Sequence, residues 1–341
     1  MLIRRSFVEL IYKGIDISTN LQNDLLSFSY TDNASGTADD VSIEIHDAKR
    51  KWISNWMFEK GDTFVTNILT MNWRKEGEKI RLPCGYFLVD QPEYKGRPSV
   101  ISLKGISTPA NSNFMHTKRN KVWKNISLKA IGNDIATRYG LKLFFDSKTN
   151  PTFKSKAQTD TSDAAFLQET CENEGFGFKV TDMKIIIFNE SFYESRKSVA
   201  KFKENSSSVL SYTFKSSLAN TAYAGVSLKY HDAKSKKTIE YMFSLNEIDK
   251  GKDKIYKINK RVSDLEEAKR LAQSTLRKLN KKETTATLEL IGDTRLLASS
   301  TIELEGFGSF DGKYYIDKAT HSIGNGFTTS IDVHKVLKGG Y

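Results

Sequence analysis

The sequence is poor in cysteine and lacks any long apolar run. Its 341 residues include two cysteines, Cys84 and Cys171, which are too few for a disulfide framework and do not form a close metal-ligand pair. No apolar run approaches the ~20 residues that span a bilayer, and residues 1–5 lack the apolar stretch of a signal peptide. We therefore expect two reduced thiols, no membrane insertion and a protein that stays in the cytosol where it is made.

The motifs of common enzyme classes are also missing. The chain has no GxxxxGK[ST] phosphate loop, GxGxxG turn, GxSxG nucleophile elbow or HExxH metal motif. Paired carboxylates occur at Asp39/Asp40 and Glu266/Glu267, but adjacent positions cannot show the ~5–9 Å separation that a glycosidase needs. The histidines are scattered: His46, His116, His231, His321 and His334. We predict a protein that is not an enzyme and has no catalytic, cofactor-binding or metal-binding residues; a wall-degrading enzyme stays an alternative.

Basic residues exceed acidic ones. The chain has 52 Lys and Arg against 41 Asp and Glu, a formal charge of +11, which could attract nucleic acid, an acidic membrane surface or an acidic protein. Local concentrations lie at residues 118–121, 234–237 and 277–282, and each could be either a solvated face or a binding patch. A basic nucleic-acid-binding module is therefore the alternative function, and it predicts steeply salt-dependent DNA binding.

Strand patterns dominate both ends of the chain. Residues 41–46 alternate apolar and polar side chains, and residues 100–103 do so more weakly, with glycine-containing turns between such runs. Strand patterns return at residues 209–214 and 222–230. These patterns predict a mainly β protein of the α+β class.

The middle of the chain has a different pattern. Apolar residues between 128 and 139 fall on one helical face that Gly140 can end, and a second short helix is expected from 163 to 174. A strand is expected at 184–188. We assign residues 111–205 to a small inserted α/β region.

The insertion separates two β domains, residues 1–110 and 206–341. The second contains an amphipathic helix over 264–280, for which Ser263 and Glu266 are the expected capping box. Its apolar face holds no Trp or Phe, so packing on its own domain is favoured over lying on a membrane surface.

One order of strand patterns occurs twice. A Gly-x-(Phe/Tyr)-x-(Val/Ile)-Asp strand is preceded by one strand and followed by a returning strand in each copy. The first copy is 41–47, 85–90 and 100–103, and the second is 286–293, 312–317 and 329–333. If the protein assembles with cyclic symmetry, a trimer of such chains presents six similar units around one axis. Such a ring can match both sixfold and threefold neighbours.

Three stretches resemble one known family. They are residues 34–47 followed by Trp52, residues 158–167 with the pattern Q-x-x-x-S-D-x-x-F-L and Gly175 beyond, and residues 286–336. This set resembles the phage late control gene D family, the baseplate hub proteins of contractile phage tails and phage-like bacteriocins. Within this family, the chain resembles the hub of PBSX-like prophages of Gram-positive bacteria.

The resemblance implies a structure and a set of partners. It implies two tube-like β-barrel domains around a central channel, a small inserted region, and a trimeric ring that adapts a sixfold tail tube to a threefold central spike. The implied partners are two further copies of the chain, the central spike protein, the tail tube protein, the tape-measure protein and baseplate wedge or sheath components, with no specific nucleic acid. The implied location is the tail baseplate of a phage or bacteriocin particle, assembled in the bacterial cytoplasm. Because residues 339–341 follow soon after the second β unit, we expect the spike and any lysis activity on separate polypeptides.

Overall fold

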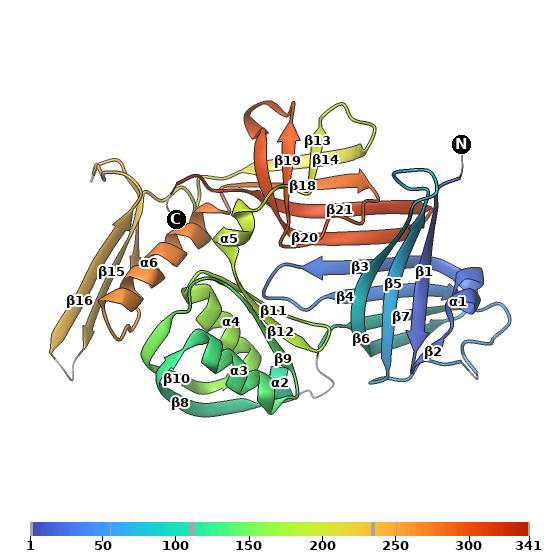
Figure 1. Cartoon of the computed structure of the whole chain (residues 1–341), viewed down its shortest axis with the longest axis horizontal. Coiled ribbons are helices and arrows are strands. Elements are labelled where there is room, and N and C mark those ends of the chain that lie inside the picture. The colour runs from blue at the N-terminus through green and yellow to red at the C-terminus, as the bar shows by residue number, and fades with distance from the viewer. Residues whose placement is uncertain (1–2, 55, 109–112, 233–235, 250, 340–341) are drawn as a thin grey trace.

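The computed structural model describes residues 3–54, 56–108, 113–232, 236–249 and 251–339. Parts of the start at 1–5, of the basic run at 234–237 and of the end at 339–341 therefore lie outside the described residues. Strands predominate over helices, which confirms the mainly β class (Figure 1).

The N-terminal unit is almost entirely β structure. Its elements are β1 (Arg5–Tyr12), β2 (Ile15–Asp16), α1 (Ser18–Asp24), β3 (Leu25–Asn33), β4 (Asp40–His46), β5 (Thr63–Met71), β6 (Lys79–Lys95) and β7 (Val100–Ile106). Apolar side chains on alternate positions of these strands form one core around Trp52, Phe64 and Phe87.

The inserted α/β region follows, and its helices begin and end where local sequence favours a cap. Ser127 and Ser162 accept N–H groups at the starts of α3 and α4, and Gly140 and Gly175 have positive φ just beyond their ends. Both expected helices and the expected strand at 184–188 are confirmed. The elements are α2 (Asn113–His116), β8 (Lys118–Ser127), α3 (Leu128–Arg138), β9 (Lys142–Asp146), β10 (Thr152–Ser162), α4 (Asp163–Asn173), β11 (Phe176–Thr181), β12 (Lys184–Asn189) and α5 (Glu190–Ser195).

The C-terminal part contains a second β unit with an insertion of its own. The unit comprises β13 (Ala200–Lys203), β14 (Val209–Ser216), β18 (Thr284–Ile291), β19 (Thr301–Glu305), the 3-10 turn η1 (Gly308–Phe310), β20 (Gly312–Gly324) and β21 (Gly326–Lys335). Between β14 and β18 lie β15 (Gly225–Asp232), β16 (Lys237–Ser244), β17 (Ile255–Ile258) and α6 (Leu265–Asn280). The strand expected from residue 222 begins at Gly225, because Ala222 has a left-handed φ of 53° that interrupts the extended chain.

The predicted repeat is present in three dimensions and is larger than the sequence pattern. The N-terminal unit has the strand order β3-β4-β7-β6-β5-β1, and the C-terminal unit has the order β14-β18-β21-β20-β19-β13, so six strands correspond one to one in chain order. The outermost pair differs, since β1 is antiparallel to β5 whereas β13 is parallel to β19.

Two irregularities in the hydrogen-bonded ladders repeat as well. The β3/β4 and β14/β18 pairs each skip one residue, Leu26 and Leu210 respectively. The β6/β7 and β20/β21 pairs each skip the aspartate of the repeated motif, Asp90 and Asp317. Because a bulge re-aims the strand and increases its twist, matching bulges bend the two units in the same way.

The two units form one continuous thirteen-stranded sheet among the described residues. The link is an antiparallel pairing of β20 with β3, in which Lys318–Ile323 lie opposite Phe28–Asn33. The tip of the β20–β21 hairpin also enters the N-terminal core, where Ile323 and Phe327 are buried. In Figure 1 the red strands of the second unit lie directly beside the blue strands of the first.

Helix α6 lies between its own three-stranded sheet and the inserted α/β region (Figure 1). Ala268 and Leu271 pack with Leu228 of β15, while Ser274 donates a hydrogen bond to the carbonyl oxygen of Asn173, the last residue of α4. The helix was predicted, but its cap lies one residue later than predicted.

Asp264, with extended backbone, is the N-cap residue of α6. Its side chain accepts the N–H of Glu267, whose carboxylate accepts both the N–H and the hydroxyl of Ser263. The predicted pairing of Ser263 with Glu266 is therefore wrong. The helix starts at Leu265, so the three-residue spacing of a capping box is met by Asp264 and Glu267.

Close packing in the N-terminal core gives the first prediction. A Cβ atom on Gly105 of β7 would lie 2.3 Å from Cζ of Phe64, whose ring stacks on Phe87 with centroids 5.6 Å apart. We expect Gly105→Ala to lower the free energy of unfolding by about 1–3 kcal/mol through overpacking, measured by urea denaturation. Gly96→Ala is the control, because nothing lies within 4 Å of its Cβ position; equal losses in both variants would contradict the packing argument.

Candidate functional site: buried junctions and open strand edges

The carboxylate pairs singled out in the sequence serve separate contacts. Asp39 is buried and accepts the N–H of Asn33 at 2.9 Å, whereas Asp40 is the first residue of β4. Burial raises the pKa of Asp39 to about 6, with Lys179 opposing the shift, and burial also raises the pKa of Asp40. In the second pair, Glu266 is exposed and contacts Lys269, while Glu267 helps to cap α6.

Lys179 of β11 joins the inserted region to the N-terminal β unit. Its ammonium group contacts the carboxylates of Asp32 on β3 and Asp39, the latter at 2.9 Å; both carboxylates are buried, and the Lys179 side chain is 11% exposed. The other carboxylate oxygen of Asp32 accepts the N–H of Ala298, before β19, at 2.9 Å. A single buried carboxylate therefore contacts all three parts of the chain.

The family-like stretch at 34–47 lies at the same junction. Ser35 accepts the N–H of Phe178 at 3.0 Å through its hydroxyl oxygen, and Gly36 donates its N–H to the carbonyl oxygen of Phe178 at 3.0 Å. This turn between β3 and β4 is thus hydrogen-bonded to β11 of the inserted region.

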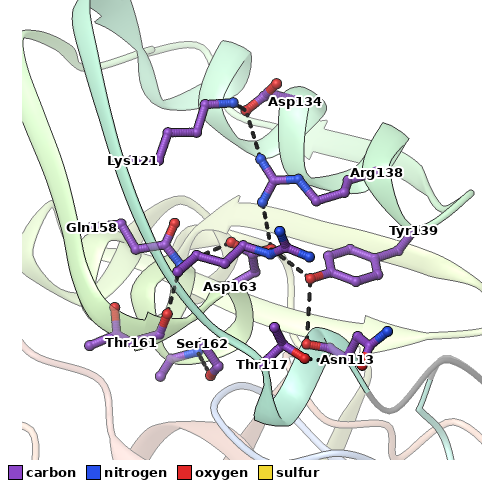
Figure 2. Close-up of polar contacts among 12 residues, drawn as sticks. Asn113, Thr117, Lys121, Asp134, Arg138, Tyr139, Gln158, Thr161, Ser162 and Asp163 are labelled. Atoms are coloured by element: carbon purple, nitrogen blue, oxygen red, sulfur yellow. Dashed lines mark hydrogen bonds and ion pairs between the residues drawn. The ribbon is translucent and has the colours of Figure 1, made fainter.

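The stretch at 158–167 forms a second buried junction, shown in Figure 2. Asp163, the first residue of α4, has no exposed side-chain surface and accepts hydrogen bonds from Arg138 at 2.6 Å and from the hydroxyl of Tyr139 at 2.7 Å. Gln158 donates to Asp163 at 2.9 Å, and Arg119 lies 3.3 Å away. The Gln and Asp of the Q-x-x-x-S-D pattern therefore tie β8, β10, α3 and α4 together.

A third junction joins the inserted region to the C-terminal unit and α6. His334 of β21 contacts Asp317 through Nδ1 at 2.7 Å and Glu194 of α5 through Nε2 at 3.0 Å. Burial lowers the pKa of His334, but the two carboxylates outweigh it and raise the pKa to about 9, so both ring nitrogens donate at neutral pH. Arg277 of α6 contacts the same Glu194.

The acidic side chains of the inserted region neutralise much of the basic clusters. Lys278 pairs with Glu172, and Lys281 pairs with Glu190 at 2.8 Å. In the cluster at 118–121, Lys118 pairs with Asp160 at 3.0 Å and Lys121 with Asp134 at 2.6 Å. These contacts favour internal docking over a nucleic-acid patch at both places; the run at 234–237 lies partly outside the described residues.

One histidine and both cysteines lie in the interior of the protein. His321 is buried, and burial lowers its pKa to about 4, so its ring is neutral and bonds the carbonyl oxygen of Leu296 and the hydroxyl of Thr329. Both cysteines are buried. Within the described ranges, no three His, Cys, Asp or Glu side chains could hold a metal ion, and no helix is long and apolar enough to cross a membrane.

Among the open strand edges of the described residues, two belong to corresponding ends of the repeated units. β14 pairs only with β18, and residues 91–95 of β6 pair only with β7. β14 is also unusually exposed, since Leu210 and Tyr212 present 53% and 43% of their surface to solvent. Unpaired N–H and C=O groups on such edges are sites for pairing with another chain.

More than half of the chain matches one known protein family. The family model described as phage tail baseplate hub (GPD) matches residues 108–327, well over half of the sequence. The chain belongs to the phage tail baseplate hub family.

Relatives agree with this membership. The probable baseplate hub protein of Escherichia phage P2 is 30% identical over 162 residues, which cover 47% of this hub-family chain and 39% of the phage protein. The chain thus spans about two fifths of the length of the curated relative it matches. Two solved structures share the fold over nearly the whole length of both chains. A tail protein from Neisseria meningitidis MC58 has a TM-score of 0.74 at 10% identity, with 97% of this chain and 96% of that chain covered. The 43 kDa tail protein of prophage MuSo2 from Shewanella oneidensis has a TM-score of 0.73 at 12% identity, with 97% of this chain and 99% of that chain covered.

Several residues of the hub-family chain were not singled out from sequence. Lys179, Glu194 and Asp32 lie in ordinary strand or helix patterns, and only the ion pairs that they form after folding distinguish them. For Asp317, which contacts His334, the sequence did contain a signal. The repeated motif places Asp317 at the same bulge as Asp90.

The Asp163 junction gives a testable stability difference. We expect Asp163→Asn to destabilise the hub by about 3–5 kcal/mol, because a buried carboxylate that neutralises arginine side chains is lost. Asp160→Asn is the matched control, since its pair with Lys118 is exposed and worth no more than about 1 kcal/mol. Thermal unfolding of both variants measures the difference, and equal transitions would refute the assigned importance of Asp163.

The His334 junction gives a pH dependence. The folded pKa of about 9 exceeds the ordinary ~6.5, so the stabilisation is fully present below pH ~6.5 and is lost as pH rises through 9. The shift corresponds to roughly 3 kcal/mol. We expect the urea midpoint of the wild type to fall more between pH 6.5 and 9.5 than that of His334→Gln. The exposed control His231→Gln should keep the wild-type slope, and a His334→Gln variant with that same slope would contradict the assignment.

Proposed function

We propose that the protein is the structural hub of a contractile tail baseplate, in a phage or a phage-tail-like bacteriocin. Membership of the baseplate hub family supports a place in the tail. The observation that carries the geometric role is the six-strand unit that occurs twice in one chain. In this proposal the protein catalyses no reaction, and its role is to position the neighbouring subunits.

The duplication suits a change of symmetry. Three copies arranged around an axis carry six similar β units, so each unit can face one subunit of a sixfold tail tube while the three chains face a threefold spike. In this arrangement the β units of three copies close tube-like layers around a channel. Such a ring accommodates both neighbours without a separate adapter.

The proposed partners follow from this position. They are two further copies of the chain, the central spike protein, the tail tube protein, the tape-measure protein, and wedge or sheath components of the baseplate. Assembly takes place in the bacterial cytoplasm, before the particle is released. The inserted α/β region, held to the N-terminal unit by Lys179 and to the C-terminal unit by the contact of Glu194 with His334, supplies the outer face of the ring.

The mass of the purified protein in solution tests the proposal. Light scattering is carried out on the chain alone and with the candidate spike protein from the same gene cluster, at low and moderate salt. We expect three times the 38.6 kDa chain mass, either alone or once the spike is added. A monomer that ignores the spike and binds DNA with steep salt dependence would overturn the proposal and favour the nucleic-acid alternative.

A further inference from the structure

The intrachain junction shows how one β unit joins the next. The two halves of β20 have different outer neighbours: Gly312–Tyr315 pair with β19, and Lys318–Ile323 pair with β3 of the other unit. The corresponding strand β6 is built in the same way, and its residues 79–88 pair with β5. Its second half, residues 91–95, pairs with nothing on that side among the described residues. The repeat therefore identifies a junction with one partner missing.

The missing partner also follows from the repeat. Strand β3 occupies the edge of the N-terminal unit, and its counterpart in the C-terminal unit is β14, whose outer edge is open. The shared bulges at Leu26 and Leu210 align the two strands residue by residue, so that Tyr30 corresponds to Phe214 and Thr31 to Lys215. The aspartates at the β6 and β20 bulges align those strands, so that Glu93 corresponds to Thr320 and Tyr94 to His321.

We propose that β14 of one copy pairs antiparallel with residues 91–95 of β6 in the next copy. The register of the intrachain junction, His321 opposite Tyr30 and Thr320 opposite Thr31, then places Tyr94 opposite Phe214 and Glu93 opposite Lys215. This interface rests on the proposed function as a trimeric hub and specifies how its copies meet.

The side chains on the two edges agree with this register. Glu93 and Lys215 are both exposed, whereas Tyr94 and Phe214 are both partly buried on the core side of their sheets. In this register, solvent-facing residues lie opposite solvent-facing residues, and core-facing residues lie opposite core-facing ones. A shift of one residue would place every side chain of one strand opposite a side chain on the other face of the sheet. The outward pair carries opposite charges, which is favourable for residues directly opposite each other.

The junction between copies lacks two features of the intrachain junction. Pro92 has no N–H, so this edge offers one donor fewer than β20 does. The buried tip residues Ile323 and Phe327 correspond to Gly96 and Ser99, so no apolar plug enters the neighbouring core. The contact between copies is therefore weaker than the contact within a copy, and the isolated chain can stay soluble until its neighbours assemble.

The contact joins two different surfaces, so every copy can offer both. Such a head-to-tail interface makes a closed ring if its rotation closes and a filament if it does not. With three copies, β6 and β14 of each chain are all satisfied and the ring has no open β6 or β14 edge.

Charge reversal tests the register. Glu93→Lys places Lys opposite Lys215, and we expect the concentration at half assembly to rise roughly fivefold or more for the trimer, alone or with the spike. Lys215→Glu combined with Glu93→Lys should restore assembly, because the pair is again of opposite charge. Glu76→Lys, an exposed acid in the turn after β5, makes the same charge change away from the edge and should leave assembly unchanged. Equal weakening by both lysine variants, or no rescue by the double variant, would overturn the register.

A cysteine pair tests the contact directly. The variant Glu93→Cys/Lys215→Cys is oxidised and then alkylated before denaturation, and we expect covalent species of two and three chains and none larger. The control variant Glu93→Cys/Ser211→Cys places its cysteines about 13 Å out of register and should give no covalent species. The wild type controls for the buried Cys84 and Cys171. A trimer by light scattering without this cross-link would overturn the edge pairing and leave the proposed function standing. A chain that is monomeric under every condition would overturn both, and a ladder beyond three chains would overturn the closed ring.

Discussion

The antiparallel pairing of β20 with β3 is the contact on which the rest of this structure depends. It joins two six-strand units into one sheet and brings Asp32 next to Ala298, so that the carboxylate of Asp32 can serve both units and Lys179 of the inserted region. Ladder hydrogen bonds are directional, and a slip by one residue would turn the buried Ile323 toward solvent. The backbone pairing therefore fixes the angle between the units as well as their contact.

Buried ion pairs orient the inserted region on this sheet. Lys179 and His334 each lie in a group of charges that joins the inserted region to the sheet, and Asp163 lies in a similar group inside the inserted region. Because removing charges from water is costly, such pairs add little net stability compared with apolar packing, but each permits one docking arrangement and penalises others.

The family-like sequence patterns are explained by these contacts. Gln158 and Asp163 close the interior of the α/β region, and Ser35 with Gly36 holds β11 against the turn between β3 and β4. The helices over 128–139, 163–174 and 264–280 were predictable because their apolar spacing and terminal residues are local signals. The sequence predicts the cap of α6 one residue too early, because Ser263 with Glu266 and Asp264 with Glu267 both meet the same spacing rule and only the backbone at Asp264 distinguishes the two pairs.

The sequence by itself determined the β-rich class, the main helices and the existence of a repeat, because alternation, helical periodicity and turn residues act over a few positions. It also determined that Asp90 and Asp317 occupy equivalent places. Only the tertiary structure decided that β20 pairs with β3, that Asp32 and Lys179 meet across 147 positions of chain, and that β14 and residues 91–95 are left open. Strand pairing and ion pairing between distant segments depend on which surfaces are brought together and freed from water, and no local pattern in the chain encodes that choice.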